Sequence, residues 1–302
     1  MSLLVGLAAF GGGLWLLVES VEGLVKSLRA WAAAAGVSGV VLAAVVLGFD
    51  LESTAAGVAA TLDDLPGTAL GTSIGAAIFL MTAGLGIAGL VAPFAIRTPW
   101  ALLATGAVAT ALAVVVCADG AVSRLDGAVL VACFGPLVAV MLRAPAGPAP
   151  PPEPGVPGAR PWLRVALGVA GLVAGAEVLV FGTGRIVGEL GVSETVFGLL
   201  VVAAAVSVEE VVLEALPAFR GFPELSVGNA LGTLCFLLTG SLGVIALVRP
   251  VEVPAAVVGY HLPALALSVV LAGGLLVRGR MGRVEGGVLV AAYAAYVAGA
   301  LL

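Results

Sequence analysis

The sequence predicts an all-α membrane protein that crosses the bilayer many times. Of the 302 residues, 61% are hydrophobic and only 10% are charged, whereas an ordinary soluble domain carries about a quarter charged residues. The mean hydropathy is +1.22, and apolar stretches repeatedly exceed the ~20 residues that cross a bilayer as a helix. These stretches do not alternate with period two, as the strands of a membrane barrel do. We therefore expect helical spans.

Ten apolar spans follow one another along the chain. The N-terminal stretch has no basic segment and no cleavage signal, so we expect it to be the first helix. The spans are predicted at residues 2–27, 37–61, 68–92, 99–118, 126–143, 162–186, 192–216, 224–248, 253–277 and 284–302.

A proline-rich linker, residues 144–161, divides the chain into two halves of five spans, residues 1–143 and 162–302. Its composition predicts an extended backbone without helix. Ten of the 13 Lys and Arg residues fall on the side of this linker and three on the other. Positive charge collects in cytoplasmic loops, which predicts a cytoplasmic linker and both termini outside in a multi-pass protein of the cell membrane. Because five is odd, the second half is expected to enter the membrane from the opposite side.

The two halves also resemble each other in sequence. A shift of 155 residues superposes residues 36–38 on 191–193, and a shift of 157 superposes a longer segment. The difference predicts that the second span is shortened between Ala43 and Gly48. Inverted repeats are typical of secondary transporters, although an old duplication without transport activity remains an alternative. The longer segment pairs Pro66 with Pro223, Gly71 with Gly228, Gly75 with Gly232, Phe79 with Phe236 and Thr82 with Thr239.

Acidic residues interrupt the middle of two apolar spans. The second span contains Asp50 and Glu52, and the seventh contains Glu209, Glu210 and Glu214. Each ionised carboxylate at such a depth costs ~2.5 kcal/mol or more. Neither span carries Lys or Arg at depth, so bound metal ions or protons are the expected partners. Oxygen ligands without His or Cys suit hard cations such as calcium or sodium.

Helical spacing sorts these acids by face. Ser207, Glu210 and Glu214 share one face of the seventh span, whereas Glu209 is expected to point elsewhere. Asp50 and Glu52 cannot share a regular helical face. Either the helix is broken there, or only one of the two faces the centre of the protein. An equally good interpretation has Glu209 and Asp50 reaching water or lipid headgroups.

Two glycine-rich segments open the third and eighth spans, at residues 71–75 and 228–233. Small residues at four-residue spacing allow close helix contact, and this packing interpretation requires no function. Asn229 and Thr233 lie on one face of the eighth span. We expect them to add neutral oxygens to a carboxylate site.

With these motifs the sequence resembles the calcium/cation antiporter superfamily, the Na⁺/Ca²⁺ exchanger-like proteins, as a divergent member. The resemblance implies ten helices in two inverted repeats, each with a motif similar to G-T-S-x-P-E followed by G-N-x-x-G-S-N. It places Glu210 at the family glutamate and Ser207 at the family serine, with residues 228–233 as the second motif. Glu52 is the best partner glutamate in the first repeat, although the 157 shift pairs it with Glu209. Thr72 stands where the family has asparagine.

Several positions depart from the family pattern. Ala76 and Ala77 replace Ser-Asn, and leucines at 80 and 237 replace polar residues. Asp50 and Glu209 instead add acids. The site is therefore poorer in neutral oxygens and richer in carboxylates, which makes cation/proton exchange, or transport of a cation other than calcium, the alternative to sodium/calcium exchange.

The resulting hypothesis is an antiporter in which Glu52 and Glu210 coordinate the transported cation from opposite repeats. The first and sixth helices are expected to rock against the remaining core. Calcium, sodium or protons are the expected cargo, and no resident cofactor is expected. The further candidate ligands are Asp50, Ser207, Glu214, Asn229, Thr233 and Thr72, and the candidate ion path is Glu22, Glu177 and Glu209.

Other functional classes fit the sequence less well. The net charge of −5 and the lack of a basic patch argue against a nucleic-acid partner, and only the bilayer and small cations are expected as partners, with no obligate protein. Residues 71–75 formally match the G-x-S-x-G nucleophile pattern around Ser73, but that pattern needs a strand-to-helix elbow and a His partner. The only histidine is His261 in the ninth span. An enzyme is therefore not expected, and a scaffold protein would leave the buried acids unexplained.

Overall fold

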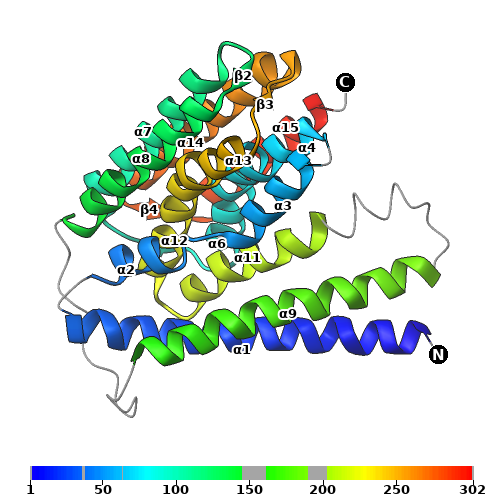
Figure 1. Cartoon of the computed structure of the whole chain (residues 1–302). Coiled ribbons are helices and arrows are strands. Elements are labelled where there is room, and N and C mark those ends of the chain that lie inside the picture. The colour runs from blue at the N-terminus through cyan, green and yellow to red at the C-terminus, as the bar shows by residue number, and fades with distance from the viewer. Residues whose placement is uncertain (1, 36–37, 63, 145–160, 190–202, 301–302) are drawn as a thin grey trace.

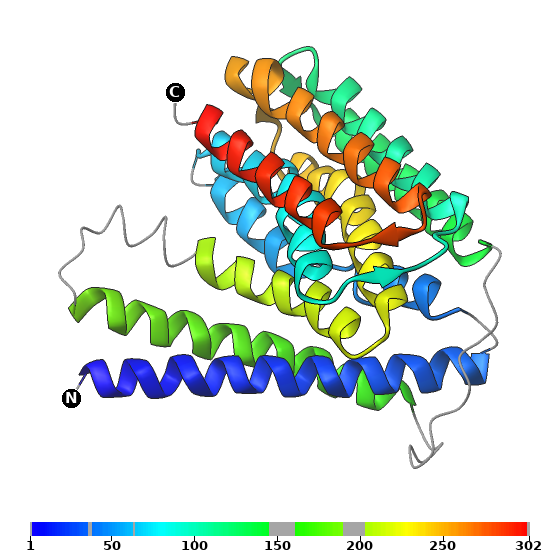
Figure 2. The same cartoon turned by 180° about the vertical axis from the view of Figure 1, so that it is seen from behind.

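A computed structural model describes residues 2–35, 38–62, 64–144, 161–189 and 203–300, and they are almost entirely helical (Figures 1 and 2). This confirms the predicted all-α class. Seven of the described helices are long and apolar enough to cross a membrane. The count of ten spans and the inversion of the two halves stay predictions. The proline-rich linker and the start of the seventh span lie outside the described residues.

Several helices contain no π-helical segment, and we call these the regular helices. Helix α8 begins with a capping box, in which Ser123 and Asp126 each accept a backbone N–H of the other residue. The regular helices are α1 (Ser2–Ala35), α2 (Gly39–Val46), α3 (Leu51–Leu62), α7 (Trp100–Cys117), α8 (Arg124–Leu142), α9 (Pro161–Glu189), α11 (Ala203–Phe219) and α15 (Arg283–Ala300).

Three further helices are each built from several labelled elements and contain π-helical segments, which the sequence pattern did not predict. Two of them begin with proline, at Pro66 and Pro223, where the missing N–H costs nothing. Helix Pro66–Val91 consists of α4 (Pro66–Leu70), η1 (Gly71–Gly75), α5 (Ala76–Phe79), η2 (Leu80–Gly84) and α6 (Leu85–Val91). Helix Pro223–Val248 consists of α12 (Pro223–Cys235), η4 (Phe236–Ser241) and α13 (Leu242–Val248), and helix Val257–Val277 of η5 (Val257–His261) and α14 (Leu262–Val277).

The predicted second span is broken between α2 and α3, which confirms one of the two alternatives left by the sequence. The break lies against α12. A Cβ on Gly48 would lie 2.3 Å from the carbonyl oxygen of Ala44 and 2.6 Å from the carbonyl carbon of Gly232. Only glycine lets the chain turn this close to another backbone.

Two short antiparallel strand pairs connect the halves of the chain. Strand β1 (Phe94–Ala95) pairs with β4 (Arg280–Met281), and β2 (Ala121–Val122) pairs with β3 (Val251–Glu252). In each pair one strand comes from the first half and the other from the second. Backbone hydrogen bonds therefore join the two halves at both strand pairs.

Helices α1 and α9 lie side by side along one edge of the molecule, and α11 lies between them and the other helices (Figures 1 and 2). Glycines allow their backbones to touch. A Cβ on Gly13 would lie 2.5 Å from the Leu179 nitrogen, and one on Gly182 would lie 2.3 Å from the Phe10 nitrogen. Such close contact is typical of small residues at membrane helix interfaces, and we call these two helices the α1/α9 pair.

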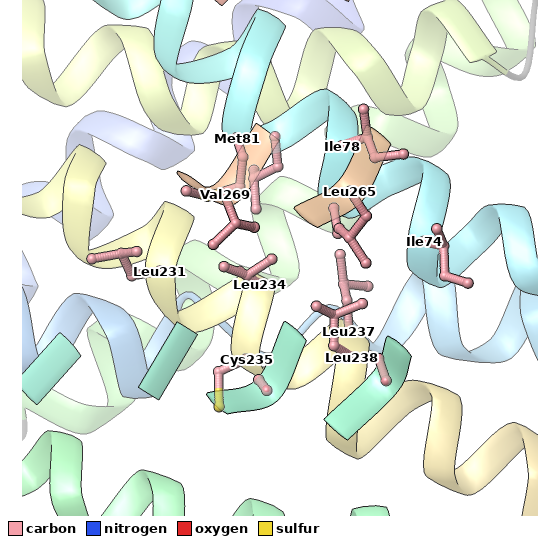
Figure 3. Close-up of a cluster of buried hydrophobic side chains, with 14 of the residues drawn as sticks. Ile74, Ile78, Met81, Leu231, Leu234, Cys235, Leu237, Leu238, Leu265 and Val269 are labelled. Carbon is pink, nitrogen blue, oxygen red and sulfur yellow. The ribbon is translucent and has the colours of Figure 1, made fainter. Parts of the chain in front are cut away.

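The hydrophobic core lies where the two π-containing helices Pro66–Val91 and Pro223–Val248 meet α14. All residues from Leu225 to Cys235 are buried. Figure 3 shows side chains of this cluster converging from the different helices. They include Ile74, Ile78, Met81, Leu231, Leu234, Leu237, Leu265 and Val269.

Candidate functional site

A cavity of about 130 Å³ lies at the break between α2 and α3. Helices α11 and α12 form further walls, and α9 contributes three apolar residues. The polar lining residues are Asp50, Ser53, Glu209, Glu210, Asn229 and Thr233. The apolar lining residues are Leu47, Phe49, Leu51, Leu80, Val169, Leu172, Val173 and Leu213.

The first half contributes Asp50, which the helix break places at the N-terminus of α3. Its Oδ1 accepts the backbone N–H of Ser53 at 2.8 Å, and the Thr54 hydroxyl donates to the Asp50 carbonyl oxygen at 3.0 Å. This is the arrangement of a helix N-cap. Ser53 was not among the predicted site residues, although Asp50 is a preferred N-cap residue whose side chain bonds the N–H three positions on. Asp50 thus stabilises α3 and also presents carboxylate oxygen to the cavity.

The second half contributes two neighbouring glutamates of α11. Glu210 is buried, with 9% of its surface exposed, and Glu209 is partly exposed. Consecutive helical residues point about 100° apart, and the cavity is wide enough that both residues line it. Glu209 therefore lines the cavity from a different side of α11 than Glu210.

Helix α12 contributes two neutral side chains with oxygen atoms to the cavity lining, the two that the sequence led us to expect there. Asn229 and Thr233 are buried one turn apart, with 3.5 Å between the Thr233 hydroxyl and the Asn229 Oδ1. On the same helix, a Cβ on Gly228 would lie 2.3 Å from the Val40 carbonyl oxygen, and one on Gly232 would lie 2.0 Å from the Ala44 carbonyl oxygen. The glycines pack α12 against α2, and the polar residue that follows each of them lines the cavity.

The charge of the cavity is negative. Three carboxyl groups and no Lys or Arg belong to its lining within the described part of the chain. No three acidic, His or Cys side chains among the described residues converge on one point, so the carboxylates surround the cavity instead of forming one tight cluster. Such a lining favours a cation that several oxygens from different helices can reach.

Two predicted ligands have side chains outside the described part of the structure. Glu52 belongs to α3 and Ser207 to α11 by their backbones. Glu214 is described, and it lies on α11 beyond the cavity lining, with no part of its surface exposed.

The other predicted residues lie away from the cavity. The Thr72 hydroxyl donates to the carbonyl oxygen of Ala69 at 2.8 Å, and Thr72 is not part of the lining. Glu22 forms an ion pair with Arg220 and lies 4.0 Å from Lys26. Glu177 is exposed on α9.

Ser73 of the formal nucleophile motif and His261 each lie beside another hydroxyl group. Ser73 is buried in the π-helical η1, where its hydroxyl lies 3.5 Å from that of Ser241. The His261 Nδ1 lies 2.7 Å from the Tyr296 hydroxyl. Ser73 thus lies within a helix and not at a strand-to-helix elbow, and the hydroxyl beside it belongs to another serine.

Comparison with known proteins agrees with this arrangement. The sequence pattern of the family described as "Sodium/calcium exchanger protein" matches residues 5–143 and 160–302. The chain is 29% identical to a proposed antiporter, CaxA, of Alkalimonas amylolytica over 251 residues, which is 76% of this chain and 77% of the relative. It is 33% identical to the inner membrane protein YrbG of Escherichia coli K12 over 127 residues, 41% of this chain and 39% of that protein.

Solved structures of the sodium-calcium exchanger NCX_Mj have the same fold. One, soaked with Na⁺ and Sr²⁺, superposes with a TM-score of 0.86 at 22% identity and covers 98% of this chain and 99% of its own. Another, soaked without Na⁺ and Ca²⁺, also gives 0.86, at 24% identity, covering 97% of this chain and 98% of its own. The chain belongs to the sodium/calcium exchanger protein family and is a membrane-embedded cation antiporter.

Proposed function

We propose that this protein exchanges calcium for sodium across the cell membrane by alternating access. The observation that carries the proposal is the cavity between the halves, in which Asp50 of the first half faces Glu209 and Glu210 of the second. Neutral oxygens of Asn229 and Thr233 complete the polar part of the lining. A set of carboxylate, amide and hydroxyl oxygens suits Ca²⁺, which takes six to eight oxygen ligands.

Glu52 and Glu210 are the proposed metal ligands from the two repeats. Asp50, Ser207, Asn229 and Thr233 complete the proposed set, and Glu209 faces the path by which the ion enters. Calcium as cargo is further supported by the fold shared with NCX_Mj, which is named a sodium-calcium exchanger.

Cation/proton exchange is the second candidate, and one feature of the cavity favours it. Leu80 lines the cavity at a position where the family pattern has a polar residue, and Leu237, its counterpart in the second half, is fully buried in the core. Each leucine removes an oxygen that would help to hold a sodium ion. Protons need only the carboxylates.

Alternating access is supported by the way the α1/α9 pair covers the cavity. Val169, Leu172 and Val173 of α9 close one side of it, and the glycine contacts make α1 and α9 a single close-packed unit. We propose that this unit moves relative to the other helices and exposes the cavity to one side of the membrane at a time. The cytoplasmic linker and the outward termini remain part of this proposal.

The two halves are proposed to be inverted repeats. Supporting this, the 157-residue shift relates helix Pro66–Val91 to helix Pro223–Val248, and both contain π-helical segments. The strands fit the same relation, because the 157-residue shift places β1 on β3 and β2 two residues before β4, which makes the two strand pairs counterparts of each other. Repeats of this kind place the ion site near the middle of the membrane, where they meet.

Calcium uptake into proteoliposomes tests the proposed cargo and counter-ion. The purified protein is reconstituted in vesicles with either an outward sodium gradient or an outward proton gradient at matched membrane potential. We expect uptake with the sodium gradient and none with the proton gradient. Uptake with protons alone would replace sodium/calcium exchange by cation/proton exchange, and uptake in neither case would exclude calcium as the cargo.

A further inference from the structure

A second acidic position lies beside the cavity and is not part of it. Glu214 follows Glu210 by one helical turn on α11, and its side chain is completely buried. Neither carboxylate oxygen has a hydrogen-bond partner among the described residues. A buried polar group without a partner is costly, and an unpaired carboxylate is among the most costly. A carboxyl group in this position is neutralised by a proton or by a bound cation, and none of the described ion pairs involves it.

The Glu214 carboxylate can lie against the facing helix because the residue there is a glycine. A Cβ on Gly84 would lie 2.5 Å from the Glu214 Oε2 and 3.1 Å from its Cδ. Gly84 ends the π-helical segment η2, all of whose residues are buried. π-helical turns break the regular i→i−4 hydrogen bonding and occur frequently at functional sites. The carboxylate thus approaches the backbone of the opposite half of the chain.

The pair of Glu214 and Gly84 has a fixed relation to the cavity. Leu80 and Glu210 both line the cavity, and Gly84 and Glu214 each follow one of them by four residues. Four residues are about one turn of an α-helix. Each of the two helices therefore contributes one residue to the cavity lining, Leu80 or Glu210. One turn further along, the same helices contribute Gly84 and Glu214.

The charged groups near Glu214 do not neutralise it. The described ion pairs join Arg220 and Lys26 to Glu22, and Arg249 to Asp64. Glu210, one turn away on the same helix, has the same sign as Glu214. The elements packed against α11 otherwise carry Glu224 on α12, Glu19, Glu22, Lys26 and Arg29 on α1, Arg164, Glu177, Arg185 and Glu189 on α9, and no Asp, Glu, Lys, Arg or His on η2 or α6.

We propose that Glu214 and the backbone around Gly84 bind a monovalent cation the size of sodium, at a site separate from the Glu210 cavity. One carboxylate balances one positive charge, whereas Ca²⁺ calls for several carboxylates and six to eight oxygens. This inference rests on the proposed exchange function and assigns the site to the counter-ion. Side chains four apart on a helix lie about 6 Å apart, so a calcium ion at Glu210 and a sodium ion at Glu214 repel each other, which favours exchange over joint binding.

Two transport measurements on the full chain in proteoliposomes separate the two sites. The first is calcium–calcium exchange without sodium, which needs only the cavity. The second is sodium-driven calcium uptake as a function of sodium concentration. The variants are Glu214→Gln, which keeps the shape and removes the charge, and Gly84→Ala, which keeps the charge and pushes the carboxylate away from the facing backbone. The controls are Glu19→Gln, an exposed acid of α1, and Gly273→Ala, a helical glycine with room for a Cβ.

We expect both variants to retain calcium–calcium exchange. We also expect the sodium concentration for half-maximal uptake to rise at least about tenfold, which corresponds to about 1.4 kcal/mol of lost binding free energy. The controls should match the wild type. An unchanged sodium dependence in Glu214→Gln would overturn the proposal. So would loss of calcium–calcium exchange together with sodium-driven uptake in both variants, or a proton-driven uptake that disappears in Glu214→Gln.

A direct binding measurement keeps the inference separate from the proposed function. If the wild-type protein does not transport calcium, the proposed cargo is wrong, but binding of radioactive sodium to the purified protein still tests Glu214. We expect the wild type to bind more sodium than Glu214→Gln. Equal binding by the two proteins would overturn the sodium site whatever the cargo is.

Discussion

Individual residues at the cavity combine structural and functional roles. Asp50 caps α3 through the Ser53 N–H and lines the cavity at the same time. The sequence identified Asp50, Glu210, Asn229 and Thr233 because acids and amides inside apolar spans require an explanation. The apolar lining from α9 could not be identified in this way, since Leu and Val are common in every span and only the folded chain shows which of them face a cavity.

Substitutions at Asp50 separate these two roles. Asn caps a helix about as well as Asp, whereas Ala does not, at a cost of about 1 kcal/mol. We therefore expect Asp50→Asn to keep the unfolding temperature and Asp50→Ala to lower it, with weaker calcium binding in both. Thermal unfolding and the half-saturating calcium concentration of exchange measure the two effects. Wild-type calcium affinity in Asp50→Asn would mean that Asp50 serves α3 alone.

At the scale of the helices, glycine positions decide which elements touch. The difference of two residues between the repeat shifts, together with the spacing of Asp50 and Glu52, predicted a shortened or broken second span, and the chain does break between α2 and α3. The π-helical segments were not predictable, because their sequences have the same apolar composition as the α-helical turns beside them. Thr72 was identified from its place in the family pattern, and in the structure its hydroxyl bonds to its own helix.

A pair of glycines related by the 157-residue shift tests this packing. A Cβ on Gly232 would lie 2.0 Å from the Ala44 carbonyl oxygen, whereas a Cβ on Gly75 meets nothing within 4 Å. We expect Gly232→Ala to destabilise the protein by about 1–3 kcal/mol, as overpacking commonly does, and Gly75→Ala to be neutral or slightly stabilising. Thermal unfolding of the purified variants measures this. Equal stabilities would show that α2 and α12 are not packed backbone to backbone.

At the scale of the whole molecule, the two halves share one cavity. The first half supplies the helix break with Asp50 and the second supplies the glutamates of α11, while the α1/α9 pair, one helix from each half, covers them. Composition and spacing predicted the all-α membrane class and the acids of the site. They did not predict which helix covers the cavity, since that depends on how many similar apolar helices pack around one another.

The proposed cation site depends most directly on Glu210, the buried carboxylate that lines the cavity. The decisive measurement is calcium–calcium exchange in proteoliposomes by Glu210→Gln, compared with wild type and with Glu19→Gln as the control for loss of one negative charge. We predict that Glu210→Gln falls to the level of empty vesicles while Glu19→Gln keeps wild-type exchange, because a buried amide cannot replace the charge that holds the ion. Wild-type exchange by Glu210→Gln would contradict the assignment of this cavity as the cation site.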